Sequence, residues 1–284
     1  MKTTFFAMAV QNCARLLPTG IVFAIGVTFL DQDAMAQPVN YGTASSFSLL
    51  GGSEITFASP TNTISGNIGS YPTPSVTGLA NVSGPYTNQS GDTGLMLDAT
   101  NDFGAAMIVA SGEPVTTTFT AGDNQLGGQT LVPGVYQFPA ATTANLEGTL
   151  TLDGNGVYIF IGTSSLVTAS DSDVVLEDGA TPCDVLWVVP TGSGTVTLGS
   201  DSTFVGTIMA GVSIGLGTDV DLDGRAWANA AVTLDGGDTV TGLPCKSLGG
   251  TRIAGVPDAG STLLLLGFGL ASMFAFGRRS FSRA

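Results

Sequence analysis

The segments VTLGSDSTFVG (196–206), IGLGTDVDLDG (214–224) and VTLDGGDTVTG (232–242) are three copies of one eleven-residue unit that start 18 residues apart. A looser copy, LVTASDSDVVL, occupies 166–176. A period of this length suits a turn of three short strands and three corners in a stacked β-solenoid. The longer first interval contains the loop EDGATPCD around Cys183, and loops are where solenoids accept insertions. An apolar run precedes each copy: VYIFIG (157–162), VLWVVP (185–190), GTIMAG (206–211) and GRAWAN (224–229).

Successive side chains of a strand point to opposite sides, so the copies can be aligned as columns. The inward columns are almost entirely apolar and predict the core: Leu166/Thr168, Val196/Leu198, Ile214/Leu216, Val232/Leu234, and then Val174, Phe204, Leu222 and Val240. The outward columns of the first strand are small and largely uncharged: Val167/Ala169, Thr197/Gly199, Gly215/Gly217 and Thr233/Asp235. Those of the second strand mix acids, hydroxyls and methyls: Asp173/Val175, Thr203/Val205, Asp221/Asp223 and Thr239/Thr241.

The apolar runs of the third side need cover on both faces. One helix is predicted at about 93–110, where Met96, Ala99, Phe103 and Met107 recur at three- and four-residue spacing. We expect this helix to lie along the stack and to shield the third side. The less regular segment 47–79 is interpreted as one or two further coils or as a cap.

Both ends of the chain differ from the middle. Residues 1–36 combine a basic start, a short apolar stretch and the site Ala34-Met35-Ala36, which predicts a cleavable export signal. After the β-domain (37–245) and a linker (246–255), the tail 256–284 holds the apolar stretch 263–277 and a basic end. It resembles the tripartite tails handled by exosortases, with Val256, Pro257 and Asp258 in the sorting motif; an ordinary C-terminal anchor is the alternative. Either interpretation places the β-domain outside the cytoplasm, with the membrane touched only through the terminal segments.

Composition excludes several kinds of function. With 22 acidic and 8 basic residues and a net charge of −14, the chain would repel nucleic acid and anionic lipid. It has no histidine, so catalytic sites that need an imidazole are excluded. The G-x-S-x-G match at 211–215 lacks a base partner and falls within a repeat. We expect no enzyme activity and no cofactor, and we expect Cys183 and Cys245 to form a disulfide in an oxidising compartment.

Three aspartates, Asp171, Asp201 and Asp219, occupy equivalent positions in consecutive copies, and Asp238 lies one residue out of register. Aspartate bonds its own backbone at turns, so these are interpreted as corner residues. A ladder of calcium sites is the alternative, because stacked carboxylates repel one another unless they are solvated or bridged by a cation.

A set of segments between 41 and 242 is similar, in order, to the microbial secreted ice-binding protein family. They are YGTASSFSLLGG (41–52), TISGNIG (63–69), the helix near 93–110, LVPGVYQF (131–138), GTLTLDG (148–154), VVLEDGATPCDVLWVV (174–189), TFVGTIMAG (203–211) and GRAWANAAVTLD (224–235). The resemblance implies a mainly β fold, a right-handed β-helix of about six coils with one long helix alongside. It also implies that one flat exposed face adsorbs to ice.

Threonine suits such a face, because one rigid branched side chain carries both a hydroxyl and a methyl group. The first-choice face comprises Thr197, Thr233, Ala169, Gly199 and Gly217. The second-choice face comprises Thr203, Thr239 and Thr241, with the corner hydroxyls Ser170, Ser200 and Thr218. Asp173, Asp221 and Asp223 add charge to the second face. A surface adhesion or matrix module, bridged by Ca²⁺, is the rival hypothesis, and a polysaccharide-active enzyme is a third.

Overall fold

The computed structural model describes residues 39–120, 122–190 and 194–248. The predicted export signal and the predicted sorting tail with Val256, Pro257 and Asp258 lie outside the described residues, as does most of the predicted linker.

The described chain is mainly β, with one α-helix, α1 (Thr93–Ser111), as the sequence predicts. Three short 3-10 helices are η1 (Gly42–Ser46), η2 (Leu79–Asn81) and η3 (Pro182–Asp184). None of the helices within the described ranges has both the length and the hydropathy that crossing a bilayer requires.

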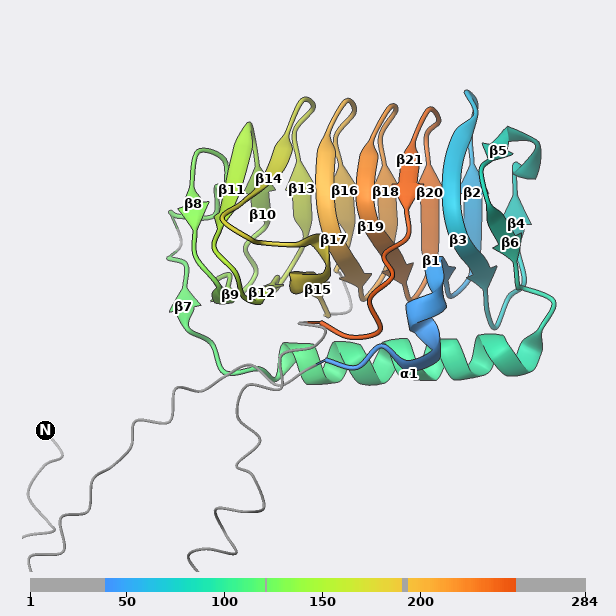
Figure 1. Ribbon diagram of the computed structural model, residues 1–284, viewed down its shortest axis with the longest axis horizontal. Helices are drawn as coiled ribbons and strands as arrows, with labels where there is room; N and C mark the ends of the chain where they lie inside the picture. Colours follow the sequence, from blue (N-terminus) through green and yellow to red (C-terminus); the bar gives the residue numbers. More distant parts are fainter. Residues whose placement is uncertain (1–38, 121, 191–193, 249–284) are drawn as a thin grey trace, which may run out of the picture. The chain divides into compact units, whose positions relative to one another are not determined.

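The strands form two sheets in which the paired strands run parallel, and Figure 1 shows them side by side. The seven-stranded sheet contains, in spatial order, β10 (Ala144–Leu146), β13 (Leu166–Thr168), β16 (Val196–Leu198), β18 (Ile214–Leu216), β20 (Ala231–Leu234), β2 (Glu54–Phe57) and β4 (Val76–Thr77).

The 14-stranded sheet bends around the other two sides. Its main path is β1 (Phe47–Gly51), β3 (Asn62–Ser70), β21 (Thr239–Thr241), β19 (Asp221–Ala228), β17 (Thr203–Ala210), β15 (Val185–Val189), β12 (Tyr158–Ile161), β9 (Gly134–Gln137) and β7 (Thr117–Thr118). Off this path lie β8 (Thr130–Leu131), β11 (Thr149–Asp153), β14 (Asp173–Glu177), β5 (Val82–Ser83) and β6 (Tyr86–Asn88).

The repeated units lie in register, which confirms the predicted columns. Thr197 pairs with Gly215, and Gly215 pairs with Thr233. The predicted inward side chains are buried. Among the predicted outward side chains, Val205 alone is buried. It belongs to the interior apolar cluster, and η3 of the inserted loop lies against its strand, β17.

The N-terminal strands join the same two sheets next to the last repeat. Segment 47–79, which the sequence predicted to be either further coils or a cap, therefore continues the stack. β2 pairs with β20, and β3 pairs with β21. From that end α1 runs back along the strands toward the opposite end, and the loop that follows it leads on to β7 (Figure 1). Segments from the two ends of the chain therefore lie side by side.

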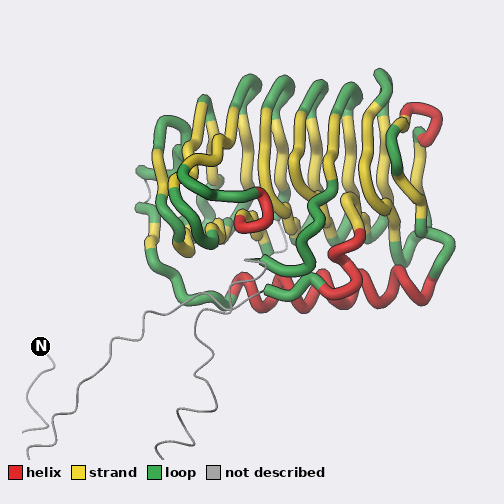
Figure 2. The backbone as a smooth tube through the Cα atoms, viewed as in Figure 1, coloured by secondary structure: helices red, strands yellow, loops and turns green. Residues whose placement is uncertain are grey.

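The interior and the helix layer are two apolar clusters. The interior contains a row of neighbouring aromatic rings from Phe138 through Phe119, Tyr136, Phe160 and Trp187 to Phe204. The second cluster joins the inner side of α1 to the outer side of the apolar strands, so the predicted shielding is confirmed. Figure 2 shows the helix along one edge of the strands. Asp92 caps α1 by accepting a hydrogen bond from the Leu95 amide at 3.0 Å.

Candidate functional site

Two strand surfaces are not covered by α1. We define face A as the outward side of the seven-stranded sheet. We define face B as the outward side of β11, β14, β21, β5 and the first halves of β17, β19 and β3. Thr197 and Thr233 lie on face A, and Thr203, Thr239 and Thr241 lie on face B. The small first-choice residues, Ala169, Gly199 and Gly217, lie at the edge of face A, one residue beyond β13, β16 and β18.

The centre of face A is a straight row of side chains, one from each strand. Strand pairing places its members opposite one another in the order Asn145, Val167, Thr197, Gly215, Thr233, Thr56 and Thr77. We call this the threonine row. Neighbouring strands are about 4.8 Å apart, so the row has a regular repeat. It contains no charged residue; Glu54 and Asp235, the acidic neighbours of Thr56 and Thr233, lie to either side of it.

Two of these threonines were not predicted. Thr56 and Thr77 come from the N-terminal strands, and Thr77 donates a hydrogen bond to Thr56 over 3.2 Å. Their alternation with Ile55 and Val76 is visible in the sequence, but nothing local shows that they continue the row of Thr233.

A second line of hydroxyls runs beside the threonine row, one residue before β13, β16 and β18. Ser165 and Thr195 lie within hydrogen-bond distance, 3.2 Å apart. The Ser213 hydroxyl accepts a hydrogen bond from the Ala231 amide at 3.3 Å. These bonds between adjacent repeats hold the hydroxyls in fixed positions.

The small residues of the first-choice set have a packing role. A Cβ on Gly199 would lie 2.4 Å from the backbone of Ala169, and one on Gly217 would lie 2.8 Å from the Ser200 amide nitrogen. These glycines therefore allow adjacent repeats to approach closely at the edge of face A. Gly215 differs, because a Cβ there would meet nothing within 4 Å.

Face B carries hydroxyls and carboxylates in alternation. One row runs through Thr149, Asp173, Thr203, Asp221, Thr239, Thr63 and Ser83. Asp223 lies between Val205 and Thr241 in the adjacent row, and burial raises its pKa above the ordinary value. Thr63 and Ser83 are again contributed by the N-terminal strands, with their hydroxyls 3.3 Å apart. Face B is therefore the more charged of the two.

The corner aspartates between the two faces adopt a backbone conformation that favours turns. Asp171, Asp201 and Asp219 have φ angles of 57°, 57° and 59°, in the left-handed region. The corner hydroxyl residues precede them, and their backbones form a ladder in which the Asp171 amide donates to the Ser200 carbonyl and the Asp201 amide to the Thr218 carbonyl. This geometry supports the interpretation as corner residues. Within the described ranges, no three His, Cys, Asp or Glu side chains are grouped so that they could hold a metal ion.

Asp238 is out of register because Gly237 takes the left-handed corner position, with φ of 79°. The Asp238 side chain is fully buried and accepts hydrogen bonds from the amides of Val220 at 2.9 Å and Gly236 at 3.1 Å. Its own amide donates to the Asn62 side chain at 3.2 Å, which links the last repeat to β3. Burial raises its pKa to about 6.

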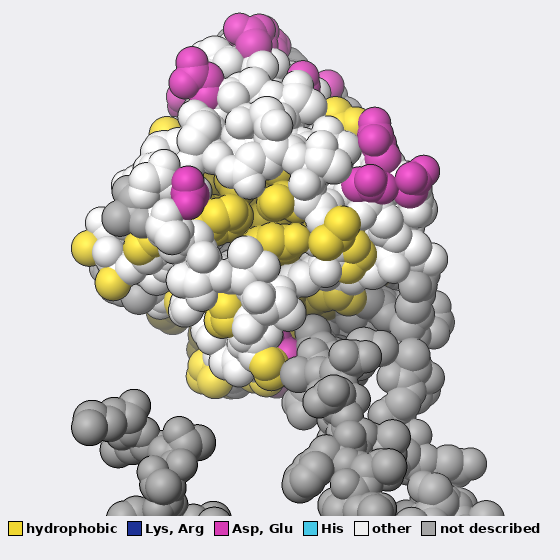
Figure 3. All heavy atoms as spheres, turned by 90° about the vertical axis from the view of Figure 1, so that its left-hand side faces the viewer, with side chains coloured by type: hydrophobic (Ala, Val, Ile, Leu, Met, Phe, Trp, Pro, Cys, Tyr) yellow, Lys and Arg dark blue, Asp and Glu magenta, His cyan; other side chains and the backbone are white. Residues whose placement is uncertain are grey.

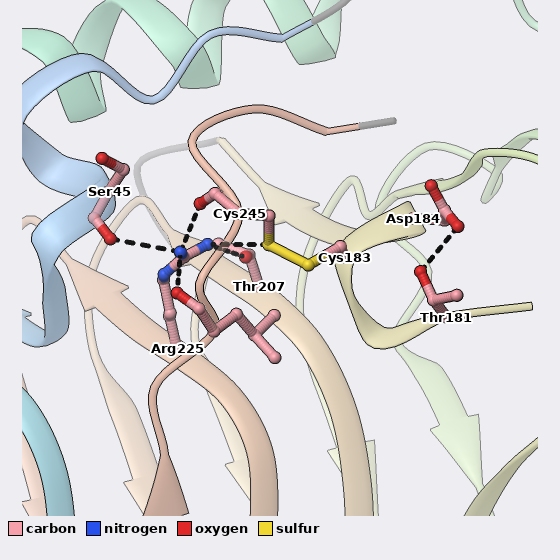
Figure 4. Close-up of a disulfide and its surroundings, with 8 residues drawn as sticks. Ser45, Thr181, Cys183, Asp184, Thr207, Arg225 and Cys245 are labelled. Atoms are coloured by element: carbon pink, nitrogen blue, oxygen red, sulfur yellow. Dashed lines mark hydrogen bonds between the residues drawn. A yellow bond between two sulfur atoms is a disulfide. The ribbon is translucent and has the colours of Figure 1, made fainter. Parts of the chain in front are cut away.

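The predicted disulfide between Cys183 and Cys245 is present, 62 residues apart in sequence. Beside it, Arg225 is buried and donates to the carbonyl oxygens of Ser45, Leu243 and Cys245 (Figure 4). The rings of Tyr41 and Trp227 lie 5.5 and 5.6 Å from the guanidinium carbon. Burial lowers the pKa of Arg225 to about 10, so the group stays charged at neutral pH.

The comparisons with known proteins agree with one another. Residues 49–241 match the family described as ice-binding-like. An ice-binding protein of Nostoc sp. (strain HG1) is 36% identical over 248 residues, which cover 84% of this chain and 86% of the relative. An ice-binding protein of Flavobacterium frigoris (strain PS1) is 30% identical over 213 residues, covering 69% of this chain and 74% of that protein. The crystal structure of an ice-binding protein from the Antarctic ascomycete Antarctomyces psychrotrophicus superposes with a TM-score of 0.65 at 31% identity, covering 74% of this chain and 100% of that one. This chain belongs to the ice-binding-like family.

Proposed function

We propose that this protein binds ice and that face A is the surface that adsorbs to the crystal. The observation that carries the choice of face is the threonine row, which lines up uncharged hydroxyl and methyl groups from successive strands. Family membership supports the activity, because the relatives are named for binding ice.

The physical argument rests on rigidity. Face A is a β-sheet over a mainly apolar interior, so its side chains are held in place before the protein contacts ice, and little entropy is lost on adsorption. Threonine methyls exclude disordered water, and the hydroxyls anchor water at a fixed spacing. Carboxylates bind bulk-like hydration shells, which disfavours face B.

The finer architecture is part of the proposal. The parallel register supports a right-handed β-helix of about six coils, with α1 packed along one side. The export signal at 1–36, with Gln37 as the first mature residue, would take the body out of the cytoplasm. The motif Val256-Pro257-Asp258 would present the tail to exosortase-type machinery, and 263–277 would span the membrane. No cofactor and no covalent chemistry are proposed.

The test compares matched substitutions on the two faces. Thr197→Tyr with Thr233→Tyr places two bulky rings in the threonine row, and Thr203→Tyr with Thr239→Tyr places the same rings on face B. We expect thermal hysteresis and inhibition of ice recrystallisation to be abolished by the first pair and retained by the second. Far-UV circular dichroism and the melting temperature establish that both variants are folded.

Each alternative outcome has a definite meaning. Loss of activity only in the face B pair would move the site to face B. Absence of ice activity in the unsubstituted body would overturn the proposed function.

A further inference from the structure

The outward side of α1 is unusually apolar for a helix surface that faces solvent. Leu97, Ala105, Ile108 and Val109 are exposed there, and Ile108 has 76% of its surface accessible. From Gly104 to Ser111 the helix has no charged residue. A helix that covers a core on one side is ordinarily polar on the other. Exposed apolar surface of this kind marks a contact with something else.

The chain leaves the described body on this same side. Residues 39–41 lie antiparallel to 246–248: the Leu248 amide donates to the Val39 carbonyl at 2.9 Å, and the Tyr41 amide to the Lys246 carbonyl at 3.0 Å. Val39 and Leu248 belong to the buried cluster formed by the inner side of α1. The described chain therefore ends beside the helix (Figure 1).

The chain after Leu248 is long enough to place the apolar stretch 263–277 in a bilayer next to α1. Fourteen residues, 249–262, separate Leu248 from the apolar stretch 263–277. Extended, they reach about 45 Å, more than the length of roughly 28 Å of a 19-residue helix. A bilayer that holds 263–277 is therefore within reach of every part of α1.

The distribution of charge favours the same side. Within 39–248 there are two cations, Arg225, which is buried, and Lys246, which is exposed at the exit of the chain. Most of the acidic side chains lie elsewhere: Figure 3, which views the molecule from the β7 end, shows many of them at its upper edge and flanks, and apolar side chains in the central hollow. On the outward side of α1 itself, Asp98 is exposed, and it precedes the uncharged stretch 104–111. The uncharged stretch 104–111 would therefore be repelled less by a membrane surface than the acidic faces of the body.

We infer that the outward side of α1 rests on the lipid bilayer when the body is tethered by its C-terminal segment. This inference depends on the proposed membrane span at 263–277. A weak apolar contact is sufficient, because the tether keeps the helix at a high local concentration near the bilayer. Faces A and B are the sides that α1 does not cover, so this orientation leaves the proposed ice-binding face in contact with water.

The experiment uses the chain from Gln37 to Ala284 in phosphatidylcholine vesicles that contain a photoactivatable phospholipid. Flotation first establishes attachment, and mass spectrometry then locates the lipid adducts. We expect adducts to concentrate in the peptide spanning 104–111. Ile108→Glu with Val109→Glu should reduce them several-fold. The matched control, Val167→Glu with Val175→Glu, changes exposed valines on faces A and B and should leave adduct formation at 104–111 unchanged.

A chimeric chain in which an unrelated polyleucine span replaces 263–277 supplies attachment independently of the native tail. Attachment of this chimera with adducts spread evenly over all three sides would overturn the docking of α1. An unchanged yield of lipid adducts at 104–111 in the Ile108→Glu, Val109→Glu variant would also overturn the docking of α1. If the chain with its native tail does not float with the vesicles but the polyleucine chimera does, the proposed span at 263–277 is wrong. Lipid adducts on α1 in the chimera would still support the docking. Ice adsorption by the lipid-free body is measured separately and tests face A alone.

Discussion

Three glycines on or beside face A differ in the space around them: two allow close backbone packing, and one lies in open space. Gly199 and Gly217 are required by the close approach of the neighbouring backbone, since an added Cβ would lie 2.4 and 2.8 Å from it. Gly215 has open space in front of it and interrupts the threonine row between Thr197 and Thr233. The first two positions are therefore closed to larger residues, and the third is open.

Gly215→Thr should raise ice-binding activity, because it joins Thr197 to Thr233 in an unbroken row. It should also stabilise the fold by about 1 kcal/mol, since glycine is a poor strand residue. The measurement is thermal hysteresis at equal protein concentration, with urea denaturation for stability. Val175→Thr adds a threonine to face B and should leave the activity unchanged; equal gains from both variants would contradict the assignment to face A.

Asp238 makes stability depend on pH. Its pKa is about 6 in the folded protein and 3.8 in a reference peptide, so the folded state binds the proton more tightly. The contribution of Asp238 to the free energy of unfolding should therefore be largest below about pH 4 and should fall by about 3 kcal/mol as the pH rises through 6.

The side chain introduced by Asp238→Asn cannot ionise, so this variant should lose the pH-dependent contribution of Asp238 to stability. The measurement is urea denaturation of both proteins between pH 4 and 7. The difference between their unfolding free energies isolates Asp238 from the other carboxylates. A difference that stays constant over this range would show that Asp238 does not titrate there.

At the scale of elements, α1 is held by its packing against the apolar strands. Phe103 is buried on its inner side and meets the Trp227 ring edge-to-face, with 6.1 Å between centroids. The Trp227 indole also donates to the Phe47 carbonyl at 3.0 Å, which ties the helix layer to β1. The helix therefore covers strands from distant parts of the sequence.

Phe103→Ala should lower the free energy of unfolding by about 3 to 5 kcal/mol, because it leaves a cavity between α1 and the strands. Asn101→Ala, on the outward side of the same helix, should change it by less than about 0.5 kcal/mol. Urea denaturation measures both. A small effect of Phe103→Ala would mean that α1 adds little to the stability of the sheets.

At the scale of the whole molecule, the two ends of the described chain are fastened together beside α1. The pairing of 39–41 with 246–248, the hydrogen bonds of Arg225 and the disulfide meet in one region. The disulfide closes a segment of 62 residues, from the inserted loop to the end of the last repeat.

Replacing both cysteines by serine should destabilise the protein by about 4 kcal/mol, the loop-closure entropy expected for this separation. The melting temperature measured with and without dithiothreitol tests this prediction. The reductant should lower the melting temperature of the wild type and leave that of the double variant unchanged. Equal melting temperatures for oxidised wild type and variant would show that the bond does not contribute to stability.

Periodicity predicted the repeated strands, the inward columns and the helix, because each depends on a pattern of side chains that local geometry translates directly into burial. Val205 broke the pattern: it is buried in the interior cluster, on a strand that contacts η3 of the loop inserted about 20 residues earlier. The first-choice face was recognisable from Thr197 and Thr233, which share a repeat position. Thr56 and Thr77 were not, because their membership depends on which strand lies next to β20.

The sequence by itself determined that strands of this chain stack in register around an apolar core, with one helix as cover. A repeat of 18 residues with alternating polarity allows no other register that buries every apolar column. Only the tertiary structure decided that the N-terminal strands close against the last repeat and extend both exposed faces. That contact joins residues about 180 positions apart, and no periodicity along the chain encodes which of two free sheet edges such a segment will pair with.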